Sequence, residues 1–327
     1  MTILVAVYSQ FVSWCIPEEQ VARLRGEFPG HTILRATSDA EALERIGDAD
    51  IAFGARITPA QLAAATRLRW IHSPAAGVGN MLFPEMLTSP VVLSNSRGNS
   101  ARTIAEHVIA VTLALMRDLP LAARRQVARV WAQDEFNAGA SIRSLEDARV
   151  LIVGLGSIGG RTARLASAFG AHVVGVRRHV DGERPPGVAA VVPTARLHDE
   201  LPLADVVVVA APQTSETVHL IGERELALMK RDAVLVNVSR GQLIDEAALV
   251  RALAGGRLRG AALDVFEHEP LSPESPLWSR EDVLITPHVS GFYAHYWRDA
   301  TTLFADNLRR FIAGEPLVNP VDKTAGY

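Results

Sequence analysis

Residues 149–178 read RVLIVGLGSIGGRTARLASAFGAHVVGVRR. Val150–Val153 is a short, continuous apolar run, as expected for a parallel strand buried on both faces. The segment GLGSIG (154–159) follows with the spacing G-x-G-x-x-G, and apolar residues at helical spacing then continue to Gly170. A second apolar run, His172–Val176, completes about 30 residues, the usual length of a βαβ unit.

The three glycines of this segment predict a dinucleotide site. Gly154 permits a tight turn, Gly156 has no Cβ to block a pyrophosphate, and Gly159 allows close packing of helix and strand. The pyrophosphate would lie at the helix N-terminus, at Ser157 and Ile158, where free amides and the helix dipole favour an anion. The alternative is an ordinary glycine-rich βα turn, which leaves the spacing of the glycines unexplained.

The end of the second strand indicates which dinucleotide is bound. A site that selects NAD has Asp or Glu there to bind the ribose 2′-hydroxyl. This chain has Arg177 and Arg178, and the next acidic residue is Asp181. Because the arginine fork suits a 2′-phosphate, we expect NADP(H) as the preferred cofactor, with NAD(H) possible. The alternative is that both arginines are solvated loop residues.

Composition limits the class of protein. The chain has 327 residues, 48% hydrophobic and 21% charged, which suits a globular protein of two domains. The formal charge of −3 shows no basic excess for nucleic acid. Cys15, the single cysteine, excludes an internal disulfide or a Cys-rich metal site, and no metal is predicted. With no signal-peptide pattern and no membrane span, a cytoplasmic protein is expected.

Strands and helices alternate along the whole chain. Residues 1–98 form one expected βα domain, and residues 99–293, which begin with a long helix and a second helix at Leu121–Trp131, form the dinucleotide-binding domain. A last helix, Asp299–Phe311, is expected to return to the first domain, so that 294–327 belongs to it. The fold class is α/β: two Rossmann-like or flavodoxin-like βα domains with doubly wound parallel sheets and an active-site cleft between them.

Two regions offer groups for a substrate. In the loop Ala75–Gly79, consecutive small residues provide amides at Ala76, Gly77, Val78 and Gly79 that suit a carboxylate, although an ordinary glycine turn is the alternative.

The other region is the carboxyl edge of the second sheet, where three predicted strands end at Arg240, at Asp264 and at His288. Taken singly, Arg240 is a surface arginine, Glu269 before Pro270 is a loop acid, and His288 after Pro287 caps a turn. Asp264, Glu267 and His268 compete with these three residues as candidates.

At this point the chain resembles the D-isomer-specific 2-hydroxyacid dehydrogenases, a family that includes glyoxylate/hydroxypyruvate reductases and phosphoglycerate and formate dehydrogenases. The resemblance covers essentially the whole chain. The matching segments are AAGVGN (75–80), GLGSIG (154–159), VNVSRGQLIDEAAL (236–249), ALDVFEHEPL (262–271), TPHVSG (286–291) and VNPVDKTAGY (318–327).

The resemblance implies a role for each candidate residue. Arg240 holds the substrate carboxylate and carbonyl oxygen, and His288 is the general acid/base. Glu269 is the acid paired with His288, which favours the imidazolium form and fixes the ring. The amides of Val78 and Gly79 are the second carboxylate contact. Further cofactor contacts are expected at Pro212, Thr217, Val238, Ser239, Asp264 and Gly291.

The chain departs from the commoner family pattern at Arg177, where many members carry Asp, and this supports the NADP subset. Tyr293, Tyr296 and Trp297 are either pocket residues or core residues at helical spacing. The resemblance also implies a homodimer that uses the helices at 100–131.

We therefore expect an NADPH-dependent 2-ketoacid reductase whose partner is a small 2-keto acid, with glyoxylate or hydroxypyruvate as the first candidates. Its two domains would close on the ligand. One alternative is an NAD-dependent dehydrogenase of the phosphoglycerate type. The other is a non-catalytic, nucleotide-sensing scaffold of the corepressor kind.

Overall fold

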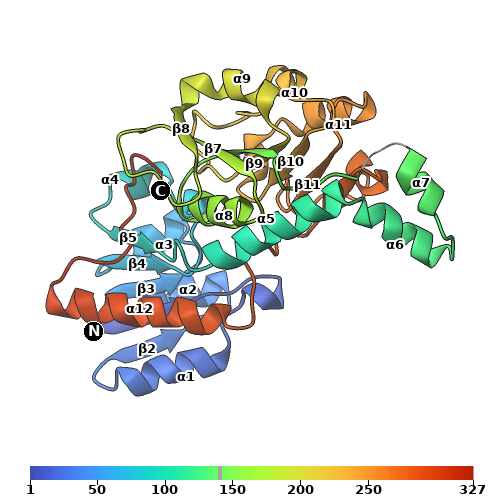
Figure 1. The fold of residues 1–327 in the computed structure, drawn as a ribbon. Coiled ribbons are helices and arrows are strands. Elements are labelled where there is room, and N and C mark those ends of the chain that lie inside the picture. The colour runs from blue at the N-terminus through green and yellow to red at the C-terminus, as the bar shows by residue number, and fades with distance from the viewer. Residues whose placement is uncertain (139–141, 327) are drawn as a thin grey trace. The chain divides into compact units, whose positions relative to one another are not determined.

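The computed structural model describes residues 1–138 and 142–326, so Tyr327, at the end of the last matching segment, lies outside the described residues. The chain separates into two units (Figure 1). Unit 1 is Met1–Ser100 with the segment from Tyr293 onward, and unit 2 is Ala101–Phe292.

Unit 1 is built on a parallel sheet of five strands in the order β2-β1-β3-β4-β5. The strands are β1 (Thr2–Ala6), β2 (Thr32–Arg35), β3 (Ile51–Gly54), β4 (Trp70–Ser73) and β5 (Val92–Asn95). The helices are α1 (Glu18–Glu27), α2 (Asp39–Ile46), α3 (Pro59–Ala64), α4 (Pro84–Thr88) and α12 (Tyr296–Ala313).

Alternate residues of each strand in unit 1 face different helical layers. Ile3 and Val5 pack in one buried cluster, whereas Leu4 and Ala6 pack in another. The first cluster includes α12, whose Phe304 stacks on Phe53 at a ring separation of 4.3 Å. This two-sided burial explains why the strands read as continuous apolar runs.

Unit 2 contains a parallel sheet of seven strands in the order β12-β11-β10-β9-β6-β7-β8. The strands are β6 (Arg149–Val153), β7 (His172–Arg177), β8 (Ala190–Pro193), β9 (Val206–Val209), β10 (Val234–Asn237), β11 (Gly260–Leu263) and β12 (Val283–Ile285). The helices are α5 (Ala101–Met116), α6 (Leu119–Val127), α7 (Gln133–Ala138), α8 (Ser157–Ala168), α9 (Leu197–Glu200), α10 (Glu223–Leu228) and α11 (Glu246–Ala254).

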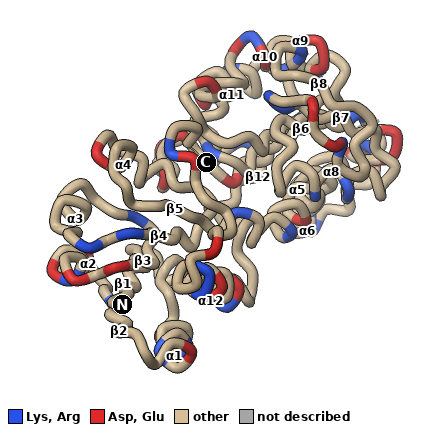
Figure 2. Tube along the Cα trace, turned by 90° about the vertical axis from the view of Figure 1, so that its left-hand side faces the viewer, with Lys and Arg blue, Asp and Glu red and all other residues tan. Residues whose placement is uncertain are grey.

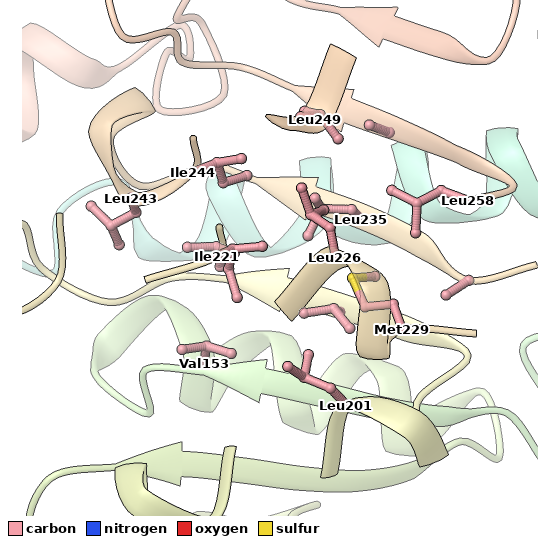
Figure 3. Packing of buried hydrophobic residues seen from close by; sticks show 14 of the residues in the cluster. Val153, Leu201, Ile221, Leu226, Met229, Leu235, Leu243, Ile244, Leu249 and Leu258 are labelled. Carbon is pink, nitrogen blue, oxygen red and sulfur yellow. The ribbon is translucent and has the colours of Figure 1, made fainter. Parts of the chain in front are cut away.

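Helices cover both faces of this second sheet. Leu151 and Val153 face the layer that contains α10 and α11, and Val150 and Ile152 face the layer of α5 and α8. Figure 3 shows part of the first layer, where Leu226 of α10 lies beside Leu235 of β10. The strand order reverses beside β6, which is where an open α/β sheet binds ligands. The predicted class, two βα units with doubly wound parallel sheets, is confirmed.

Some predicted boundaries are wrong. The helix expected at Leu121–Trp131 begins at Leu119 and ends at Val127, because Pro120 fits the first turn of a helix instead of preceding it. The last helix starts earlier than Asp299. The edge strand β8 was not predicted: its residues Ala190–Val192 are apolar, but the run ends at Pro193, which disfavours a strand, and its side chains are at most half-buried.

The described residues include no helix long and apolar enough to span a membrane, and no cluster of three or more metal-ligating side chains. Figure 2 shows basic and acidic residues mixed along α1, α2 and α12.

Candidate active site

The turn between β6 and α8 has the geometry of a phosphate-binding turn. Gly154 has a φ of 103°, and a Cβ there would overlap the backbone of Ala211. A Cβ on Gly159 would overlap the carbonyl oxygen of Gly154. Gly156 faces open space, with no heavy atom within 4 Å of a Cβ built on it. Packing therefore requires glycine at the first and third positions, while the second leaves room for a ligand.

The first turn of α8 presents amides that the helix itself does not use. Gly156 is the N-cap residue, and the amide of Gly160 donates to its carbonyl at 2.9 Å. The amides before Gly160, including those of Ser157 and Ile158, precede the first hydrogen bond of the helix. With the positive end of the helix dipole, they suit an anion such as a pyrophosphate.

The arginines at the end of β7 have partners within unit 2. Arg177 donates to the carbonyl oxygens of Val180, Gly182 and Glu183, the one to Gly182 at 2.7 Å, and Arg178 pairs with Glu216. The Nε of Arg177 is buried without a partner. In this structure the guanidinium of Arg177 thus holds its own loop, so a 2′-phosphate would have to share it with these carbonyl oxygens.

Three further loops bring together an arginine, a carboxylate and an imidazole. Arg240 follows β10, Glu269 lies in the loop after β11, and His288 follows β12. These three strands are neighbours and parallel, so their carboxyl ends share one edge of the sheet. His288 Nδ1 lies 2.7 Å from Glu269 Oε2. The competing acid, Glu267, pairs with His219 instead, at 3.0 Å.

Close backbone packing positions Arg240 and Glu269. A Cβ on Gly241 would overlap the backbone of Phe266, so only glycine lets the loop after β10 approach the loop after β11 this closely. The side chain of Asn237 donates to the carbonyl of Arg240 at 3.0 Å. On the other loop, the amide of Phe266 donates to Glu269 Oε1 at 3.0 Å.

The charges of this group support one another. Burial lowers the pKa of Arg240 from its ordinary value, and the Glu269 carboxylate opposes that shift. Burial on its own raises the pKa of Glu269, but the hydrogen bond from His288 and the charge of Arg240 outweigh it, so the pKa falls below its ordinary value. Glu269 is therefore ionised at neutral pH and lies beside the imidazole as a hydrogen-bond acceptor.

Asp264 holds the loop that carries His288. It is 1% exposed, and its carboxylate accepts hydrogen bonds from the amides of Val289 and Ser290, at 2.9 and 3.0 Å. It also accepts one from the hydroxyl of Thr286 at 2.6 Å, and His107 of α5 lies 3.3 Å from the same hydroxyl. No pattern in the sequence assigned Thr286 to this network. The position of Thr286, two residues before His288, was the feature of the sequence that could have indicated this role.

The other predicted cofactor residues lie in nearby loops. Thr217 donates to the carbonyl of Pro212 at 2.8 Å in the loop after β9. Ser239 donates to the carbonyl of Ala211, which joins the loops after β10 and β9. Val238 is buried and Gly291 is half-buried.

The remaining candidates belong to unit 1. In the loop Ala75–Gly79, Val78 is buried while Ala76 and Gly79 are exposed. Tyr296 is 5% exposed, donates to the carbonyl of Pro74 at 2.9 Å and packs edge-on against Trp297. Of the two possible roles for these aromatic residues, Tyr296 has that of a core residue.

Known proteins resemble the chain over most of its length. The family model "D-isomer specific 2-hydroxyacid dehydrogenase, NAD binding domain" matches residues 109–290. The glyoxylate reductase of Korarchaeum cryptofilum is 33% identical over 287 residues, 86% of this chain and 85% of that protein. The D-3-phosphoglycerate dehydrogenase of Methanocaldococcus jannaschii is 32% identical over 287 residues, 86% of this chain but 53% of that protein. The chain thus spans about half the length of the phosphoglycerate dehydrogenases that it matches.

A solved structure extends the likeness to the complete fold. The NADPH-dependent glyoxylate/hydroxypyruvate reductase of Sinorhizobium meliloti, in complex with NADP and sulfate, has a TM-score of 0.85 and 28% identity, covering 100% of this chain and 99% of that one. The matched family model, the identity to curated members and the βα architecture agree, and the chain belongs to the D-isomer-specific 2-hydroxyacid dehydrogenase family.

Proposed function

We propose that the protein is an NADP(H)-dependent oxidoreductase that interconverts a small 2-keto acid and its D-2-hydroxy acid, acting as a 2-ketoacid reductase. The observation that carries the proposal is the His288–Glu269 pair next to Arg240, on the strand-end edge that also bears the glycine turn. A proton donor, a fixed cation and an anion-binding helix end are the groups that this reduction needs.

The residues of unit 2 fit a nicotinamide dinucleotide. The space in front of Gly156 and the first amides of α8 would receive the pyrophosphate. We assign Pro212, Thr217, Val238, Ser239, Asp264 and Gly291 to the rest of the cofactor site. When bound, the nicotinamide supplies a hydride for the keto carbon.

The side chains of the protein donate the proton, orient the imidazole and bind the substrate. His288 donates a proton to the carbonyl oxygen, and Glu269 keeps the imidazole oriented. Arg240 holds the substrate carboxylate and carbonyl oxygen with its planar fork. The amides of the loop Ala75–Gly79, those of Val78 and Gly79 above all, are the second contact that we assign to the carboxylate.

For the substrate, we favour glyoxylate or hydroxypyruvate. Two of the relatives described above are named as a glyoxylate reductase and as a glyoxylate/hydroxypyruvate reductase. Phosphoglycerate is the second candidate, because the relative from Methanocaldococcus jannaschii is a D-3-phosphoglycerate dehydrogenase.

A panel of 2-keto acids and 3-phosphoglycerate, assayed with NADPH and with NADH, tests this function. We expect turnover of glyoxylate or hydroxypyruvate with NADPH, and a loss of about 10²–10⁴-fold in kcat for His288→Ala. Nucleotide binding without any turnover would overturn the proposal in favour of a nucleotide-sensing scaffold. Preferred oxidation of 3-phosphoglycerate with NAD would favour the second candidate.

The proposed preference for NADPH rests on Arg177 and on the absence of an acidic residue at the end of β7. We expect Arg177→Ala to lower kcat/KM with NADPH much more than with NADH. Arg184→Ala is the matched control, since Arg184 is an exposed arginine of the same segment that donates to the carbonyl of Ala189 at 2.8 Å. Equal losses with both nucleotides for Arg177→Ala would mean that the arginine only holds its loop.

We also propose a homodimer formed through α6 and the segment after it. Figure 1 shows α6 and α7 projecting from the rest of unit 2. Val127 and Trp131 are 86% and 90% exposed, and large apolar side chains left in water favour association.

A further inference from the structure

Two carbonyls of the loop Ala75–Gly79 are held toward the body of unit 1. Asn95 Nδ2 donates to the carbonyl of Ala76 at 2.7 Å, and the amide of Ser96 donates to the carbonyl of Ala75 at 3.2 Å. The carbonyl of Val78 takes part in the short helical turn that follows, where it accepts from the amide of Met81 at 2.8 Å.

These contacts decide where the loop amides point. In a planar trans peptide the C=O and N–H bonds point in opposite directions. With the carbonyls of Ala75 and Ala76 held inward, the amides of Ala76 and Gly77 are turned outward. Among the described residues, neither of these two amides has an acceptor. Outward amides from successive residues form a concave anion site.

A buried hydrogen-bond chain fixes the frame of this loop. The hydroxyl of Ser96 donates to the carbonyl of Ser73 at 3.0 Å, so its oxygen accepts from His72 Nε2 at 3.2 Å. The imidazole of His72 is neutral, because burial lowers its pKa to about 3. His72 Nδ1 therefore accepts from the hydroxyl of Ser94 at 2.7 Å, whose oxygen accepts from the indole of Trp70 at 2.8 Å.

We propose that Asn95 is a positioning residue for substrate binding: its side-chain amide turns the Ala76–Gly77 peptide so that the loop presents N–H groups to the carboxylate of the 2-keto acid. The inference rests on the proposed function, and Ser96 with His72 holds the loop in the same orientation.

Neighbouring groups set the orientation of the Asn95 amide. The side chain is 2% exposed, and its Oδ1 accepts from the amide of Arg97 at 3.2 Å. The nitrogen must then face the carbonyl of Ala76. In Asn95→Asp, of nearly the same shape, a carboxylate oxygen would face that carbonyl, and the peptide would lose its donor and be repelled.

The test compares Asn95→Asp with Asn307→Asp in steady-state reduction of glyoxylate by NADPH. Asn307 is the matched control: it is fully buried in α12, and its Nδ2 donates to the carbonyl of Val318 at 3.0 Å. We expect Asn95→Asp to raise KM for glyoxylate about tenfold or more, with KM for NADPH unchanged. Asn307→Asp should lower the melting temperature without moving either KM.

The possible results distinguish failure of the positioning role from failure of the proposed function. An unchanged KM for glyoxylate in Asn95→Asp, while the wild type is active, overturns the positioning role and leaves the proposed function standing. No turnover by the wild type with any keto acid removes the function, and the inference with it. If Asn95→Asp does not fold, Asn95→Ala, which removes the same donor without adding a charge, takes its place. A rise in KM for glyoxylate is expected there too, and no rise overturns the inference.

Discussion

At the scale of single residues, His288 has an unfavourable backbone conformation. Its φ is 54°, in the left-handed region, which costs an L-residue roughly 1–2 kcal/mol. The amide of His288 donates to the carbonyl of Asp264 at 2.8 Å, and the Asp264 carboxylate accepts from the next two amides. Asp264 therefore stabilises the conformation that places the imidazole beside Glu269.

We expect Asp264→Asn to lower kcat by at least about tenfold, because the amide nitrogen would face backbone N–H donors and the loop would lose its conformation. Single-turnover kinetics on folded protein would measure this. The control is Asp205→Asn, since Asp205 accepts from the amide of Arg149 at 2.8 Å and lies just before β9, at the opposite end of the sheet. That variant should lose stability but keep its kcat. An unchanged kcat in Asp264→Asn would contradict the role.

His72 makes the stability of the protein depend on pH. Its pKa is about 3 in the folded state and roughly 6.5 when unfolded, so between these values the unfolded chain binds one more proton. The free energy of unfolding should therefore fall as pH drops below 6.5, by about 1.4 kcal/mol per pH unit from this residue.

Urea denaturation at pH 7.5, 6 and 5 would measure that slope in the wild type and in His72→Gln. The variant lacks the titrating ring, and we expect it to show a shallower dependence over this range. Equal slopes would mean that His72 does not titrate on unfolding.

At the scale of elements, different glycines of the turn between β6 and α8 serve packing and ligand binding. Gly159→Ala places a methyl group against the carbonyl of Gly154 and should destabilise the protein by about 1–3 kcal/mol or more. Gly156→Ala meets no atom within 4 Å, so we expect a nearly unchanged melting temperature but greatly weakened NADPH binding.

Gly160→Ala is the control for both glycine variants. A Cβ there lies 3.7 Å from Pro185, an ordinary contact, and alanine favours the helix by up to about 1 kcal/mol. Thermal melting and nucleotide titration would separate the three variants. Normal NADPH affinity in Gly156→Ala would place the pyrophosphate elsewhere.

At the scale of the whole molecule, we expect a dimer that depends on the apolar side chains near α6. Trp131→Glu and Val127→Glu should halve the mass measured by sedimentation equilibrium, because a charge would have to be buried in the interface. Val12→Glu is the control, since Val12 in unit 1 is 87% exposed, nearly the same as Val127. A wild type that sediments as a monomer would contradict the proposal.

The sequence by itself determined the strands, the glycine turn and the class of fold. Runs such as Val206–Val209 are apolar throughout because both faces of the sheet are covered, and a buried strand leaves that mark on its own residues. The edge strand β8 was not predicted although Ala190–Val192 is apolar, because the run ends at Pro193, a residue disfavoured in strands.

Only the tertiary structure decided which side chains meet. Glu269 and His288 are 19 positions apart, and they come together because β11 and β12 are adjacent and parallel. Glu267, two residues from Glu269, pairs with His219 instead. In the same way, Arg177 is held by carbonyls of its own loop, and Asn95 reaches a loop 19 positions before it. Contacts between distant segments depend on strand order and loop packing, which no local pattern of residues records.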